Sequence, residues 1–112
     1  MESILDSVKK QLGIEKDYRH FDAQIITHIN SVFMTLNQLG VGPDTPFYIE
    51  DELSTWHEFL NGRMDLNAVQ TYIGLCVRLL FDPPTTSFVL DAMQRSINEF
   101  EWRLTAQANS SS

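Results

Sequence analysis

The sequence is poor in the features of secreted and membrane proteins. Its only cysteine, Cys76, excludes an internal disulfide and is typical of a reducing compartment. No apolar run approaches the roughly 20 residues that span a bilayer. The first residues also lack the basic start and the unbroken apolar core of a secretory signal. We therefore expect a chain that folds in the cytosol and makes no contact with a membrane.

Positive charge is scarce as well. Eight Lys and Arg stand against fifteen Asp and Glu, for a formal net charge of −7, and the basic residues occur singly apart from Lys9 and Lys10. Proteins that grip DNA displace counterions from its phosphates with clustered cations. The sequence therefore argues against tight nucleic-acid binding, whereas an acidic surface suits a protein that DNA passes without sticking. Residues 40–62 contain no Lys or Arg and hold Asp44, Glu50, Asp51, Glu52 and Glu58.

Catalytic and metal-binding motifs are missing too. The three histidines lie in separate segments, at His20, His28 and His57, without a partner at a metal-ligand spacing. His20 and Asp22 stand at a helix start, which favours a helix cap over an acid–base pair. Cys76 lies in an apolar helix, where a thiol packs as a small hydrophobe. Residues 50–52 lack the alternating oxygen donors and the glycine of a calcium loop. We predict no enzymatic activity, no cofactor and no metal.

Apolar residues recur at helical spacing in four segments, and 112 residues suffice for one core. The predicted helices cover residues 3–12, 22–39, 65–81 and 86–107. Gly13 and Gly40 stop the first two, and Asp65 is the expected N-cap of the third. The predicted fold is all-α, a small bundle of about four helices with an irregular acidic and aromatic loop between the second and third. We expect one domain over residues 1–108 and a frayed tail at 109–112.

The irregular segment, residues 41–62, combines acid with aromatic side chains. Thr55 and Glu58 form a capping box at the start of a short helical turn. The apolar triplet at residues 47–49 has two interpretations. It either adds a strand to the sheet edge of a partner or fills the core of its own domain.

The last two predicted helices are the most apolar parts of the chain. The third contains "YIGLCVRLLF", which predicts a buried helix whose surplus apolar surface a neighbouring subunit covers. The last carries an apolar seam at Leu90, Met93, Ile97, Phe100 and Leu104, and a ladder of alternating charge at Asp91, Arg95, Glu99 and Arg103. Phe88 and Trp102 lie off the seam, so they either pack on other elements of the domain or are exposed interface anchors.

The stretch "FDPPTTSF", residues 81–88, joins these two helices. Pro83 excludes Asp82 from helical backbone angles, Pro84 does the same to Pro83, and neither proline offers an N–H. The sequence therefore predicts a stiff elbow, with Thr86 or Ser87 capping the next helix. We interpret Asp82, Pro83 and Pro84 as an elbow that orients the last helix, whose far end we expect to project.

These segments resemble the head–tail connector proteins of tailed bacteriophages, also called adaptor or head-completion proteins, especially the branch found in phages of Gram-positive hosts. The resemblance covers residues 4–104. Its most specific part is "RLLFDPPTTSFVLDAM" followed by "EWRL", and "VKKQLGI" and "TWHEFL" add to it.

The resemblance implies a homo-oligomeric ring, about twelve-fold, below the portal protein in the virion neck, assembled in the host cytoplasm. The next neck protein, a stopper or tail-completion protein, is a further partner, and DNA passes through without specific binding. By analogy, the portal contact falls on Glu101, Trp102, Arg103, Leu104 and Gln107. The surface toward the channel or the next ring falls on Asp44, Phe47, Tyr48, Glu50, Asp51 and Glu52. The alternative is a small cytosolic helical adaptor or regulator that binds one protein partner.

Overall fold

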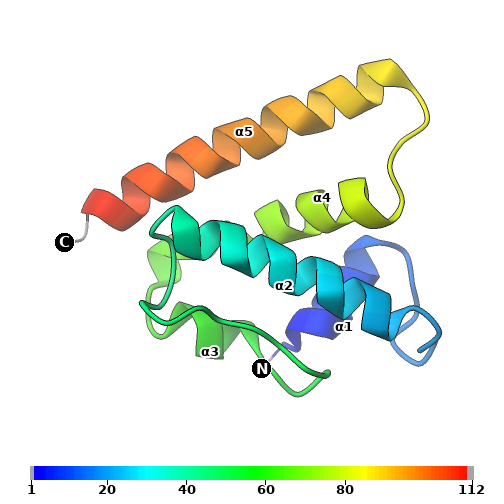
Figure 1. Ribbon diagram of the computed structural model, residues 1–112, viewed down its shortest axis with the longest axis horizontal. Coiled ribbons are helices and arrows are strands. Elements are labelled where there is room, and N and C mark those ends of the chain that lie inside the picture. The colour runs from blue at the N-terminus through cyan, green and yellow to red at the C-terminus, as the bar shows by residue number, and fades with distance from the viewer. Residues whose placement is uncertain (1, 111–112) are drawn as a thin grey trace.

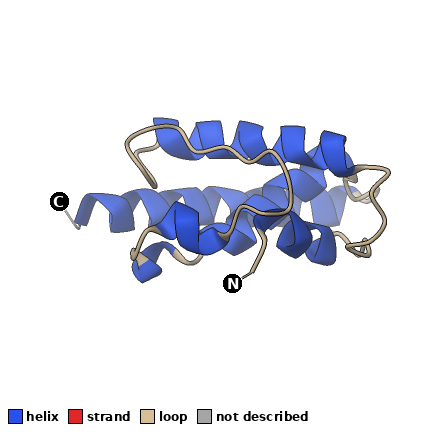
Figure 2. Ribbon diagram, turned by 90° about the horizontal axis from the view of Figure 1, so that it is seen from below, coloured by secondary structure: helices blue, strands red, loops and turns tan. Residues whose placement is uncertain are grey.

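The structure is a computed structural model, and it describes residues 2–110. Its helices are α1 (Ile4–Gln11), α2 (Asp22–Gln38), α3 (Trp56–Leu60), the 3-10 helix η1 (Met64–Leu66), α4 (Val69–Phe81) and α5 (Ser87–Ser110). The described residues contain no strand, and one antiparallel bridge joins Ser3 to Thr55. The predicted all-α class is confirmed (Figures 1 and 2).

The helices form two layers. Figure 2 shows α2 along the upper edge, with α1, α4 and α5 below it, and the shortest dimension of the molecule is 19 Å. Two layers of helices at the usual spacing of about 8–10 Å account for that thickness. The α2–α4 contact is the most extensive between helices. Both helices contribute to the common core, α2 with Ile29 and Phe33 and α4 with Tyr72, Ile73 and Val77. The prediction that the third helix is buried is therefore confirmed for one side of α4.

Local sequence signals set several helix ends as expected. Ser3 Oγ caps α1 by accepting from the N–H of Asp6 at 3.2 Å. Gly13 and Gly40 follow α1 and α2 with φ of 77° and 79°, a conformation that glycine adopts without steric cost. The capping box of Thr55 and Glu58 is present at the start of α3. These ends could be predicted because each depends on residues that are neighbours in the chain.

The predicted start of the third helix is wrong. Asp65 lies in η1, and α4 begins at Val69, behind Ala68, with no side-chain cap. The carboxylate of Asp65 instead accepts two hydrogen bonds from the guanidinium of Arg63, both at 3.0 Å. The guanidinium partner holds the pKa of Asp65 well below its usual range. This bidentate pair occupies the oxygens that a cap would use.

The predicted cap by Asp22 is also wrong, because the carboxylate serves a buried lysine. Lys9 is fully buried, and its Nζ lies 2.8 Å from Asp22 Oδ1. The same Nζ donates to the carbonyls of Lys16 at 2.9 Å and Tyr18 at 2.7 Å. The loop between α1 and α2 therefore wraps around one ammonium group, which compensates for its burial.

The C-terminal helix is longer than predicted. α5 continues to Ser110, past the expected helix end at residue 107. The last two residues of the predicted frayed tail, 111 and 112, lie outside the described residues.

Candidate interaction surfaces

α5 is anchored by its second half. Leu104 is 2% exposed and Ile97 is also buried, whereas every residue from Ser87 to Asp91 is exposed. Leu90, on the same predicted seam, is 39% exposed. The seam is therefore confirmed for its C-terminal part only. The loosely packed end of the helix is the first turn, next to the elbow, and the last turn extends past the rest of the bundle, as expected (Figure 1).

The elbow begins at Asp82, whose backbone has the predicted geometry. Asp82 has φ −148° and ψ 71°, outside the helical region, and its N–H donates to the carbonyl of Arg78 at 2.9 Å. Arg78 Nε donates back to the carbonyl of Asp82 at 3.2 Å. The carbonyl of Thr86 then accepts from the N–H of Leu90, which opens α5. Side chain and backbone together fix the exit of the chain from α4.

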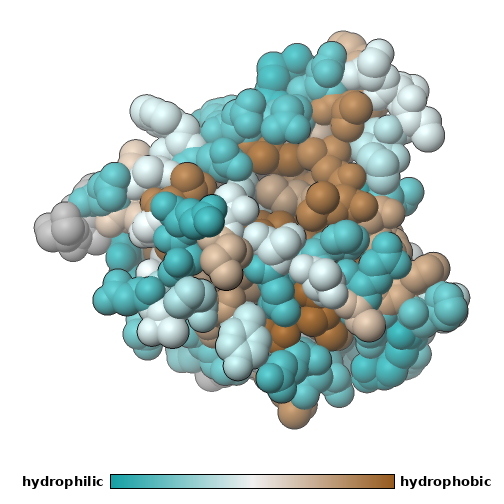
Figure 3. Space-filling view, in the orientation of Figure 1, coloured by the Kyte–Doolittle hydropathy of each residue, from teal (hydrophilic) through white to brown (hydrophobic). Residues whose placement is uncertain are grey.

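A groove lies between α2, α4 and α5. Its volume is about 360 Å³, and its apolar walls include Val32, Cys76, Leu79, Leu80 and Ile97. Figure 3 shows it as a largely brown area beneath the upper right part of α5. We call it the α2/α4/α5 groove. Its width follows from the way α5 diverges from α4 toward the elbow (Figure 1).

A hydrogen-bonded phenol and carboxylate lie at one wall of this groove. Tyr72 Oη donates to Glu101 Oε2 at 2.8 Å. Burial, and then the bond to the carboxylate, raise the pKa of the Tyr72 phenol well above its usual range. Burial also raises the pKa of the Cys76 thiol to about 11. Both groups are therefore neutral at pH 7, and Cys76 lacks the electropositive setting of a reactive thiol.

The titration of Cys76 gives a test of this environment. We expect the rate of alkylation by iodoacetamide to rise with an inflection near pH 11 in the folded protein. In urea the inflection should return to about pH 8.5, the value of a free thiol. Because folding favours the neutral thiol, this group loses its contribution to stability as the pH rises from about 8.5 toward 11. Circular dichroism at each pH verifies that the helices persist, and an inflection near 8.5 in the folded protein would contradict the burial.

Two of the aromatic residues discussed above are fully outside the core. Phe88 is 79% exposed and Trp102 is 73% exposed. Packing within the domain is therefore excluded for both, and the interpretation as exposed side chains holds. Arg103, next to Trp102, is exposed and forms an ion pair with Glu99, one step of the predicted charge ladder.

The other residues predicted for the portal contact make contacts within this chain. Leu104 belongs to the core, so its side chain is not available to a partner in this fold, which corrects the prediction. Glu101 accepts the bond from Tyr72, and Gln107 Nε2 donates to Asp65 Oδ2 at 3.1 Å. The second half of α5 is thus fastened to α4 and η1, and the outward-facing part of the predicted set is Trp102 and Arg103.

The triplet at residues 47–49 fills its own domain. Phe47 packs edge-on against Phe33 and Phe59, with ring centroids 5.1 and 5.3 Å apart. Ile49 is buried, its N–H donates to Asn30 Oδ1 at 2.8 Å, and its carbonyl accepts from Asn30 Nδ2 at 2.9 Å. The backbone of Ile49 is therefore already paired, which argues against strand addition there. Tyr48 points outward and is exposed.

The acidic residues of the middle segment lie mostly at the surface. Asp44, Glu50 and Asp51 are exposed, and Asp51 Oδ1 accepts from the N–H of Leu53 at 2.9 Å. Glu52 is half-buried, 3.6 Å from Arg19. No group of three potential metal ligands occurs among the described residues. These carboxylates form a solvated acidic surface.

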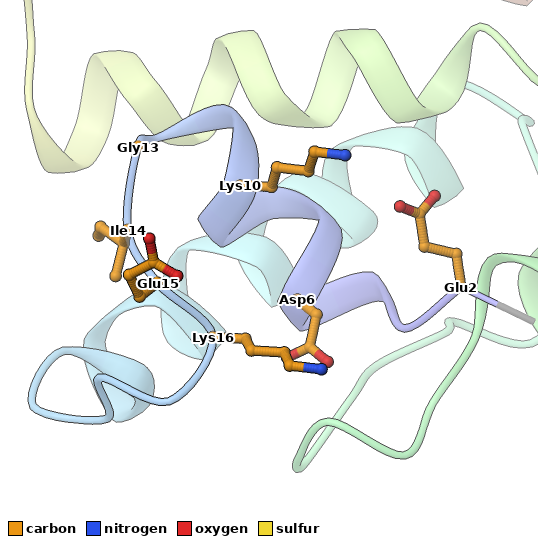
Figure 4. A pocket seen from close by; sticks show the side chains of 7 residues that line it. All are labelled: Glu2, Asp6, Lys10, Gly13, Ile14, Glu15 and Lys16. Carbon is orange, nitrogen blue, oxygen red and sulfur yellow. The ribbon is translucent and has the colours of Figure 1, made fainter.

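A hollow of about 480 Å³ lies beside α1 and the loop that follows it. Figure 4 shows Glu2 and Glu15 at opposite sides of the hollow and the ends of Asp6 and Lys16 overlapping in this view, away from both. Charges of both signs that do not converge on one point give no ligand a defined place. This hollow is a surface depression between charged side chains.

Fold and surfaces together define a class: a small helical protein with exposed apolar side chains suited to contacts with other proteins. The sequence matches the phage connector protein family over residues 4–111, and the chain belongs to that family. Comparisons with curated proteins and with solved structures gave no match.

Membership in the family confirms the resemblance to head–tail connectors. It indicates a structural role in the neck of the virion, in association with other head and tail proteins of the phage. The branch of Gram-positive hosts stays a prediction. Between residues 2 and 110 no helix has the combined length and apolar character that crossing a bilayer requires.

Proposed function

We propose that the chain forms a closed ring of about twelve copies between the portal and the next neck protein. The ring completes the head and extends the DNA channel. The observation that carries the proposal is the match to the phage connector protein family along almost the whole chain. The outward-facing Arg103 belongs to the proposed portal contact, and Tyr48 with the acidic residues around it belongs to the surface facing the channel or the next ring.

Exposed apolar side chains support a role in assembly. Phe88, Val89 and Leu90 are all exposed in the first turn of α5, and Leu80 is exposed at the end of α4. Leaving a large apolar side chain in water forgoes about 1.5–3 kcal/mol relative to burial. Contiguous apolar patches on a small soluble protein mark contact surfaces. This cluster, on both sides of the elbow, is a surface that a neighbouring protein covers.

The acidic surface supports a role as a wall of the channel. Asp44 and Glu50 are exposed on a segment that contains no basic residue. DNA phosphates feel such charges within about 8 Å at physiological salt. Repulsion keeps the passing duplex from binding, which is what a conduit requires.

Charge reversal tests the channel wall. We expect phage that carry Asp44→Lys with Glu50→Lys to assemble normally but to eject DNA several-fold more slowly, because lysines bind phosphates and release counterions. The matched control is Glu15→Lys with Asp17→Lys, which reverses two exposed carboxylates outside that segment. The measurement is the rate of DNA release in vitro. Equal rates for both variants and the wild type would remove the acidic residues from the channel wall.

The ring itself is tested by co-purification with the portal. Co-expression of tagged portal protein with this chain should yield a stable complex, and the chain should be found in purified virions. A folded chain that neither binds the portal nor occurs in the virion would sink the proposal and favour the alternative, an adaptor for one other protein.

A further inference from the structure

The outer face of α5 carries an aromatic ridge. Phe88, Arg95 and Trp102 are spaced seven residues apart and therefore lie on one face of the helix. All three are exposed, and the two aromatic residues are about 21 Å apart along the helix at a rise of about 1.5 Å per residue. We call Phe88, Arg95 and Trp102 the α5 ridge. Aromatic side chains surrounded by charged ones have the composition of interface hot spots.

The α2/α4/α5 groove is nearly free of charge. α2 contains no charged residue after Asp22. Among the described residues that line the groove only Glu101 is charged, and Tyr72 donates to its carboxylate. Apolar walls depleted of charge are typical of the buried centre of a protein interface. The volume of about 360 Å³ falls in the range of roughly 300–1,000 Å³ found for pockets that bind small molecules, so an aromatic side chain fits.

Apolar complementarity favours a second copy of this chain as the occupant, because the chain itself exposes aromatic side chains that can fill the groove. Each copy carries a net charge of −7, so two copies repel wherever their acidic surfaces face each other. In the groove another acidic chain meets an apolar surface. The one carboxylate there already accepts a hydrogen bond, so it repels the incoming chain less. The ridge offers what the groove needs, since its aromatic side chains need cover and the charge of Arg95 is balanced by its ladder neighbours Asp91 and Glu99.

Ridge and groove face different directions on the same helix. The groove is lined from α5 by Gln94, Ile97 and Glu101, which point inward, whereas Phe88 and Trp102 point to solvent. A copy that inserts its ridge into a neighbour therefore keeps its own groove open for a third copy. Contacts of this head-to-tail type produce closed rings when the rotation between copies closes.

We propose that the α5 ridge of one copy packs into the α2/α4/α5 groove of the next. This contact rests on the proposed ring and names the two surfaces that build it. The elbow at residues 82–84 acts indirectly, because it fixes the direction in which α5 presents its ridge.

Cysteine cross-linking on the assembled complex tests the contact. The variant Arg95→Cys with Leu80→Cys, in a Cys76→Ser background, keeps both ridge aromatics and places one thiol on the ridge and one in the groove. Assembled on the portal and oxidised, it should give a ladder of dimers, trimers and higher oligomers. The control pair Tyr48→Cys with Leu80→Cys uses a similarly exposed site off the ridge and should give no ladder. Adding Phe88→Ser and Trp102→Ser should lower the cross-linked fraction by about tenfold or more, as loss of two hot-spot side chains does.

Each of the alternative results of the cross-linking experiment contradicts a specific claim. A product that stops at dimers means a symmetric contact and overturns the head-to-tail arrangement. Rings on the portal without any ridge-to-groove cross-link overturn the inference and leave the proposed function standing. A cross-link from the groove to a different neck protein assigns the groove to that partner and also overturns it. Failure of the wild-type chain to join the portal at all overturns the ring and this contact together.

Discussion

Replacing Lys9 by Met is expected to lower the free energy of unfolding by about 3–5 kcal/mol, the usual cost of breaking a buried ion pair. The Nζ of Lys9 is within hydrogen-bond distance of Asp22 and of the carbonyls of Lys16 and Tyr18. Met fills the space of the lysine stem but donates no hydrogen bond. The substitution therefore removes the buried cation next to Asp22 Oδ1, leaving that carboxylate only its pairing with Arg19, and removes the donor of two carbonyls. Burying such groups with their partners removed is costly.

Lys10 provides a matched control in the next position of the same helix. Its side chain is exposed, so Lys10→Met should change the free energy of unfolding by no more than about 0.5 kcal/mol. Urea denaturation followed by circular dichroism measures both variants. Equal effects at the two positions would mean that Lys9 does not hold the loop between α1 and α2.

Leu104→Ala is expected to destabilise the protein by about 2–5 kcal/mol, whereas Leu90→Ala should cost less than about 1 kcal/mol. Both residues are leucines on the same seam of the same helix, so helix propensity and chemistry are matched. Leu104 is buried against the rest of the bundle, and the large value includes the cavity that the substitution leaves. Leu90 is partly exposed at the loosely packed end of α5. The comparison measures which half of the helix is anchored, again by urea denaturation.

The reverse order of these two effects would show that the first turn of α5 is the fixed end. In that case the groove would be narrower and the ridge would be directed elsewhere. Retained stability in the Leu90→Ala variant together with weaker assembly on the portal would instead locate Leu90 at a contact between proteins. Assembly is measured with the same co-purification that tests the ring.

The fold was largely predictable because its helix ends depend on local signals. Gly13, Gly40 and the capping box of Thr55 and Glu58 act within a few residues of the chain. Lys9 and Asp65 were missed for a different reason. Lys9 is buried because the loop that follows α1 folds back and brings two carbonyls to its Nζ, and Asp65 pairs with Arg63 instead of capping α4. Helical periodicity predicts neither the burial of Lys9 nor the pairing of Asp65 with Arg63.

The surfaces were less predictable than the helices. The seam of α5 has uniform spacing, so its pattern predicts the same degree of burial for Leu90 and Leu104. Their difference arises from the angle between α4 and α5, which the elbow sets and spacing alone does not contain. The ridge was visible as Phe88 and Trp102 lying off the seam, but their exposure required the fold. The groove was not predictable, since its walls come from three helices.

The central claim, a ring of this chain on the portal, is tested most directly by the mass of the complex. Native mass spectrometry of the portal co-purified with this chain should show about twelve copies bound per portal ring, without a ladder of partial occupancy at saturation, because a ring closes. One or a few copies per portal at saturation, or an intact portal with none, would contradict the account.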